Sequence, residues 1–182
     1  MVSQSRDALL HCLPRSLSAC WLIALALIHT PAALSAEFSG FVIGIKDGDS
    51  IAVVTQDQIK HEVRLAGIDA PEKRQPYGDA AQAHLAKLIA RRLVRVIGNK
   101  RDRYGRTVAK IMLGDQDISL AQLEAGFAWH YKQYQREQSA HDVVAYALAE
   151  RRAQQTNAGL WQNPDAVAPW VWRTQKRISL AD

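Results

Sequence analysis

The chain has 182 residues, with 23 lysines and arginines against 18 aspartates and glutamates, and a formal net charge of +5. This length suits one domain with a tail, because domains most often hold about 100–150 residues. The basic balance favours a polyanionic partner. Both cysteines, Cys12 and Cys20, lie in the first 36 residues, so the rest of the chain excludes a cysteine nucleophile and a thiolate metal site.

Residues 1–36 have the pattern of an export signal. Arg6 and Arg15 precede an apolar run from Leu17 to Ile28, and small residues follow it. A positive start, a short apolar core and a small-residue exit are typical of secretory signals, and we expect cleavage near Ser35 or Ala36. The alternative is an uncleaved anchor, although a membrane span needs roughly 20 apolar residues. We expect an exported protein, periplasmic or secreted, which is monomeric and has no stable membrane association after cleavage.

The mature chain opens with a predicted β-hairpin. Apolar and polar residues alternate from Phe38 to Ile45, Asp47-Gly48 predicts a two-residue turn, and Ile51–Val54 predicts the second strand. Asp49 shares the strand parity of Ile51, so we expect its side chain to point toward the inner face. An ionised carboxylate is costly there unless it is paired or liganded.

A third strand is predicted from about Ile59 to Ile68. Arg64 falls on the face opposite the buried apolar residues, so we expect it to face solvent. Asp69 ends the strand, and the proline that follows makes Ala70 extended, so that its backbone carbonyl can serve as a ligand. Glu72 comes next.

This arrangement brings Asp49, Asp69 and Glu72 to strand ends. Three converging carboxylates repel one another unless a cation lies among them, and oxygen ligands suit a hard ion such as Ca²⁺. The neighbouring Arg64 is the kind of group that a phosphodiester would need.

The remaining pattern predicts two strands and three helices. They are a helix from Asp79, strands Leu93–Ile97 and Arg106–Leu113, a helix from the capping box Ser119–Gln122 to Gly126, and a helix from Ser139 to Gly159. One helix after the third strand and two more at the end indicate an α+β fold, a five-stranded OB-type β-barrel with three packed α-helices. Residues 37–161 would form this domain. Residues 162–182 would be a tryptophan-containing tail that packs on the domain or is partly ordered.

With these elements in place, the sequence from about Phe38 to Trp161 resembles the staphylococcal-nuclease-like (thermonuclease) family. The resemblance rests on four short stretches: Asp47-Gly48-Asp49, Arg64–Glu72, Asp102–Arg106 and Gly159-Leu160-Trp161. It implies that Asp49, Asp69 and the carbonyl of Ala70 bind Ca²⁺.

The same resemblance implies roles for the other candidate residues. Glu72 would act through a water, and Arg64 and Arg106 would hold the scissile phosphate. The substrate-binding residues would be Arg103 and Tyr104 at the terminal phosphate or nucleotide, and Tyr131 or Tyr134 stacked on a nucleotide.

The function implied is an exported, Ca²⁺-dependent nuclease that hydrolyses DNA and RNA and leaves 3′-phosphate and 5′-hydroxyl ends. The alternative is a non-catalytic OB-fold module that binds single-stranded nucleic acid. A degenerate binding module would be expected to lose some of the residues that act on the phosphate. All five are present, namely Asp49, Arg64, Asp69, Glu72 and Arg106, and this favours the enzyme.

Overall fold

The computed structural model describes residues 36–179. Residues 1–35, which carry nearly all of the expected export signal and both cysteines, lie outside the described residues. Within the described part, no helix is both long and apolar enough to cross a membrane.

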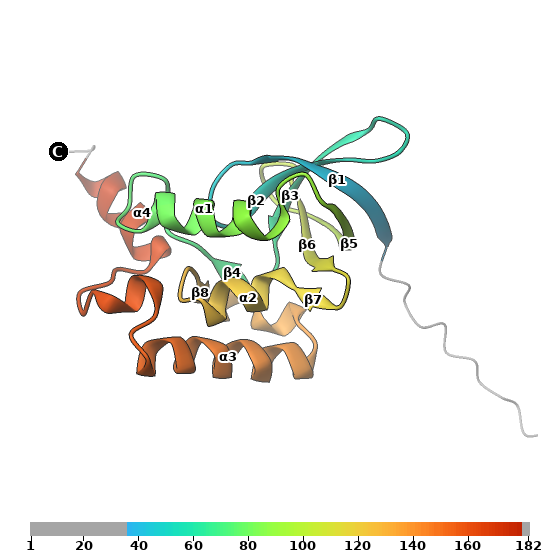
Figure 1. The fold of residues 1–182 in the computed structure, drawn as a ribbon. Helices are drawn as coiled ribbons and strands as arrows, with labels where there is room; N and C mark the ends of the chain where they lie inside the picture. Colours follow the sequence, from blue (N-terminus) through green and yellow to red (C-terminus); the bar gives the residue numbers. More distant parts are fainter. Residues whose placement is uncertain (1–35, 180–182) are drawn as a thin grey trace, which may run out of the picture. The chain divides into compact units, whose positions relative to one another are not determined.

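Five strands close into a barrel (Figure 1). They are β1 (Glu37–Ile45), β2 (Ser50–Val54), β3 (Lys60–Leu65), β5 (Leu93–Arg101) and β6 (Thr107–Leu113). Neighbours in the order β3-β2-β1-β5-β6 are antiparallel, and β3 also pairs with β6 in parallel, which closes the barrel. Register shifts in β1 and in β5 mark irregularities of the bulge type, which bend and twist a strand.

Helices cover one side and one end of the barrel. They are α1 (Gly78–Ile89), α2 (Ile118–Glu124), α3 (Ala140–Gln155) and α4 (Pro169–Ile178), with short 3-10 helices η1 (Lys132–Glu137) and η2 (Gly159–Gln162). The short strands are β4 (Ile68–Asp69), β7 (Gln116–Asp117) and β8 (Trp129–His130). The predicted α+β barrel with packed helices is confirmed, and α4 adds a helix in the predicted tail.

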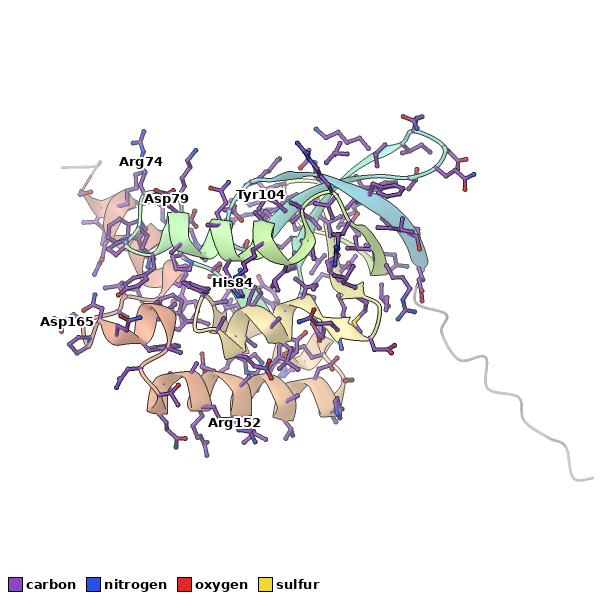
Figure 2. The ribbon with its side chains drawn as sticks, viewed as in Figure 1. Arg74, Asp79, His84, Tyr104, Arg152 and Asp165 are labelled. Atoms are coloured by element: carbon purple, nitrogen blue, oxygen red, sulfur yellow. The ribbon has the colours of Figure 1, made fainter. Side chains whose placement is uncertain are left out.

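The core lies between the barrel interior and the first two helices. Its fully buried members include Ile51, Val63, Leu65, Val96, Ile111, Leu85, Ile89 and Leu123. Figure 2 shows His84 on the side of α1 that faces α2, where its ring nitrogen contacts the amide oxygen of Gln122. The buried Gln122 also donates to the carbonyl of Gly48 at 2.7 Å, so α2 is tied to the loop that carries Asp49.

Several predicted boundaries are wrong. The strand predicted to end at Ile97 continues to Arg101, and the helix predicted to end at Gly159 ends at Gln155. The strand predicted from Ile59 to Ile68 breaks after Leu65, because Gly67 adopts a φ of 76° and turns the chain into β4. The cap of α2 is Asp117 and not Ser119, since the Asp117 carboxylate accepts the N–H groups of Ser119 and Leu120. The predicted capping-box positions are instead used for tertiary contacts.

The predicted two-residue Asp-Gly turn is also wrong, because residues 46–49 form a four-residue connection between β1 and β2. Gly48 does not adopt a positive φ. A Cβ atom there would lie 2.7 Å from the Cβ atoms of both Ala70 and Ala81. Close approach therefore requires glycine, and this contact sets the position of the Asp49 backbone against the β4 end.

Gly48→Ala is expected to lower the free energy of unfolding by about 1–3 kcal/mol, because the added methyl overpacks a closed contact. Gly44→Ala is the matched control. Its Cβ would lie at an ordinary 3.6 Å from Ala52, so it should be neutral or stabilising by about 0.5–1 kcal/mol. Urea denaturation of both variants checks this, and equal effects would contradict the packing explanation.

Candidate active site

The centre of the site is a pair of buried carboxylates bridged by one arginine. Asp49 lies in the β1–β2 connection and Asp69 ends β4, with exposed fractions of 1% and 0%. Arg64 of β3 contacts the Asp49 carboxylate through Nη1 and donates from Nη2 to Asp69 Oδ1 at 2.7 Å. Asp49, Arg64 and Asp69 therefore come together. The predicted convergence of three carboxylates is not found among residues 36–179, because Glu72 does not join Asp49 and Asp69 in one metal-binding group.

Arg64 does not face solvent as expected from its strand face. Its side chain is only 17% exposed, because it packs against the buried carboxylates of Asp49 and Asp69. The same Nη2 also donates to the carbonyl of Ile68 at 3.2 Å. Arg64 is thus part of the buried charge balance of the domain and not only a candidate substrate ligand.

Backbone hydrogen bonds hold Asp49 in place. Its N–H donates to Asp47 Oδ1 at 3.0 Å, and its carbonyl accepts the N–H of Leu65 at 2.8 Å. The N–H of Ala70 donates to Asp49 Oδ2 at 2.6 Å. Ala70 therefore lies beside Asp49, as the proposed ligand set needs, while the role of its carbonyl stays a prediction.

One guanidinium does not balance this pair. Burial raises the pKa of Asp49 from 3.8 to about 8, although the charge of Arg64 works in the opposite direction, and the charges of Asp47 and Asp69 raise it further. Burial alone would lower the pKa of Arg64, but Asp49 and Asp69 outweigh burial and raise it, so Arg64 stays charged. An additional positive charge in the pocket would therefore stabilise the ionised form of Asp49.

The donor chemistry of Asp49 and Asp69 fits a hard divalent cation. Both offer carboxylate oxygens, and the unfavourable burial of their charge is what a bound cation would relieve. In residues 36–179 no group of three or more His, Cys, Asp or Glu side chains is gathered closely enough to hold a metal ion. A Ca²⁺ ion, which takes 6–8 oxygens, would thus draw its other ligands from backbone carbonyls, water or substrate.

Arg106 joins the site through a serine that the sequence did not single out. Its Nη1 donates to Ser50 Oγ at 3.0 Å, and Ser50 Oγ donates to Asp49 Oδ1 at 3.1 Å. On the other side of the Arg106 guanidinium, Asp102 Oδ2 lies 2.8 Å from Nε and 2.7 Å from Nη2. Burial works to raise the pKa of Asp102, but the bonds from Arg106 outweigh it and lower the pKa. In the sequence, only the position of Ser50 next to Asp49 could have indicated that it links Arg106 to Asp49.

Arg103 and Tyr104 lie on the β5–β6 turn beside Arg106. Tyr104, labelled in Figure 2, is 68% exposed. The guanidinium carbons of Arg103 and Arg106 lie 4.8 and 5.5 Å from the centre of its ring. An exposed ring flanked by two cations is suited to a nucleotide base and its phosphate.

The two candidate stacking tyrosines lie in different surroundings. The rings of Tyr131 and Tyr134 meet edge-on at 5.1 Å. Burial, and after it the charge of Asp69, raises the pKa of Tyr131, so this ring lies on the carboxylate side. One face of the ring is stacked on Trp170 of α4, at 5.4 Å and 14° between the planes. Tyr134 is 45% exposed and has the ammonium of Lys100 at 5.4 Å from its ring centre.

Glu72 is joined to Asp69 by a residue that sequence reasoning missed, Arg173 of α4. Arg173 Nη1 donates to Glu72 Oε1 at 2.8 Å, and Nη2 donates to Asp69 Oδ2 at 2.7 Å. No spacing could have indicated this contact, since Arg173 follows Asp69 by 104 positions and lies in the segment predicted to pack on the domain or to be partly ordered. The structure thus gathers three arginines around the carboxylates.

Asp49 should make the cation-free protein less stable as pH rises. Because its pKa is higher in the folded than in the unfolded state, the folded state binds more protons between pH 3.8 and about 8, and this group's contribution to the free energy of unfolding falls across that window. Asp49→Asn should flatten this part of the profile. Denaturation in chelator from pH 4 to 8 measures it, and parallel profiles for the two proteins would contradict the assignment.

Comparison with known proteins places this site in a family. The model of the family described as staphylococcal nuclease homologue matches residues 62–163. An uncharacterized endonuclease of Haemophilus influenzae is 38% identical over 140 residues, which are 77% of this chain and 75% of that protein. Protein ParB of Escherichia coli is 37% identical over 84% of this chain and 88% of its own. A micrococcal nuclease of Shigella flexneri is 38% identical over 76% and 82%. The chain belongs to the staphylococcal nuclease family.

Proposed function

We propose that the protein is an exported, Ca²⁺-dependent nuclease that hydrolyses phosphodiester bonds of DNA and RNA and leaves 3′-phosphate and 5′-hydroxyl ends. Relatives whose names include endonuclease and micrococcal nuclease support a nucleic-acid hydrolase. The observation that carries the proposal is the convergence of two buried carboxylates on Arg64, with Arg106 one hydroxyl group away.

Each residue of the candidate site has a separate role in the proposed phosphodiester hydrolysis. Asp49, Asp69 and the carbonyl of Ala70 would hold Ca²⁺, which when bound polarises a phosphate oxygen. Glu72, whose side chain is 41% exposed, can hold the attacking water as general base or as an orienting group.

Arg64 and Arg106 would stabilise the charge that develops on the phosphorus oxygens, because a guanidinium offers two parallel hydrogen bonds. Asp102 already orients the Arg106 guanidinium, so this side chain loses little conformational freedom when substrate binds. The side chains so placed grip phosphate and carry no requirement for a 2′-hydroxyl, which is why both DNA and RNA are proposed as substrates.

The second candidate function is a binding module that holds single strands without cutting them. The exposed Tyr104 between two arginines would serve it equally well. The buried pair of Asp49 and Asp69 would not, since two desolvated carboxylates repel a polyanion and cost free energy. This cost is explained by catalysis and not by binding alone.

Purified protein is expected to cleave both DNA and RNA with Ca²⁺ and neither with chelator, giving fragments with 5′-hydroxyl ends. Arg106→Ala should slow single-turnover cleavage by roughly 10³–10⁵, the worth of a transition-state arginine in phosphoryl transfer. Arg95→Ala is the control, because Arg95 is an exposed β5 arginine paired with Glu37 at 3.1 Å.

End-labelling of the fragments, with circular dichroism on each variant, measures these outcomes. Fragments with 5′-phosphate ends would contradict the proposed direction of attack. A near-native rate for Arg106→Ala at saturating Ca²⁺ and substrate would favour the binding module. Arg64→Ala is a weaker test, since it removes the arginine that bridges both buried carboxylates, takes from Asp49 its ion pair, and should cost about 3–5 kcal/mol of stability.

The export of the protein is proposed from the pattern of residues 1–36. A cut after Ser35 has Ala33 and Ser35 at the small-residue positions, and it would release a chain without cysteine. Amino-terminal sequencing of the exported protein should find Ala36 or Glu37 first. A full-length chain recovered only from membranes would mean that the segment is an anchor.

A further inference from the structure

The C-terminal helix α4 brings a third arginine to the carboxylates. It lies beyond residues 62–163, the segment that the family model matches. Figure 1 shows α4 beside the loop that leads into α1, which is the loop that carries Glu72. Arg173 is therefore a site residue that the matched family segment does not contain.

Arg173 and Arg64 together take up most of the hydrogen-bonding capacity of Asp69. Asp69 Oδ1 accepts from Arg64 at 2.7 Å and from Arg173 Nη1 at 3.2 Å, and Oδ2 accepts from Arg173 Nη2 at 2.7 Å. A carboxylate accepts about four hydrogen bonds, so at most one lone pair remains for a cation. Glu72 Oε1 is held by the same guanidinium.

This contact belongs to a docked helix and not to a free side chain. Val167, just before α4, accepts a hydrogen bond from the buried side chain of Gln75 at 2.5 Å. Pro169 is buried at the first turn, where its fixed φ favours helix entry. Trp170 stacks on Tyr131, so α4 touches the carboxylates and the candidate nucleotide platform together.

We propose that Arg173 is an active-site residue that competes with the divalent cation for Asp69 and Glu72, and so weakens cation binding. The inference rests on the proposed function, since it takes Asp69 to be a cation ligand. The reason is electrostatic, because a guanidinium and a divalent ion at one carboxylate repel each other. Both use the same carboxylate oxygens, so each must displace the other to bind there. Docking of α4 therefore weakens cation binding, and by linkage cation binding weakens the docking of α4 by the same factor.

The test is calorimetric titration of Ca²⁺ into the protein, with substrate absent. Arg173→Gln, which removes the charge and keeps most of the side chain, should bind Ca²⁺ on the order of tenfold more tightly than the unsubstituted protein. Arg173→Lys keeps the charge and should stay closer to the unsubstituted protein. Arg177→Gln is the matched control on the same helix, because Arg177 donates to the Thr174 hydroxyl at 3.3 Å and not to the carboxylates, and it should leave the affinity unchanged.

The possible results separate the inference from the proposed function. If Ca²⁺ binds the unsubstituted protein and Arg173→Gln equally, or binds the variant more weakly, competition is wrong and Arg173 merely packs or supports the site. If neither protein binds Ca²⁺, the proposed cation site fails and the inference with it. Circular dichroism and tryptophan fluorescence confirm that α4 and the domain remain folded in each variant, so that a loss of structure is not mistaken for a change in affinity.

Discussion

The burial of two carboxylates around the bridging guanidinium of Arg64 is the constraint on which the rest of the site depends. Asp49 and Asp69 are almost wholly removed from water, and Arg64 alone does not restore the pKa of Asp49 to its ordinary range. Such a pair is costly in a folded protein unless further positive charge is supplied. The surrounding structure supplies it through side chains and, in the proposed function, through Ca²⁺.

The barrel enforces this unfavourable arrangement by close packing. Gly48 lies against Ala70 and Ala81 with no room for a methyl group, and Gln122 holds the Gly48 carbonyl from α2. The loop with Asp49 is thus clamped between β4 and two helices. Strain or charge at a functional site persists only where the surrounding packing determines it in this way.

Much of the fold and of the site could be predicted because local signals agreed. Alternating residues predict the strands, and the parity of Asp49 with Ile51 predicts an inward carboxylate, which is found buried. Two features could not be predicted. Arg64 lies on the expected strand face, opposite Val63 and Leu65, but that face is covered by Asp49 and Asp69, a tertiary contact that alternation does not indicate. Arg173 reaches the site through the docking of α4, a tertiary contact with no periodic signal in the sequence.

The most direct test of a cation-requiring carboxylate pair is the effect of Ca²⁺ on stability without any substrate. The free energy of unfolding is measured by urea denaturation with Ca²⁺ and with chelator, for the unsubstituted protein and for Asp69→Asn. Ca²⁺ at about 100 times its dissociation constant should add about 2.7 kcal/mol to the unsubstituted protein and much less to the variant at the same concentration. Absence of any Ca²⁺ effect in the unsubstituted protein, or an equal gain in Asp69→Asn, would contradict the account.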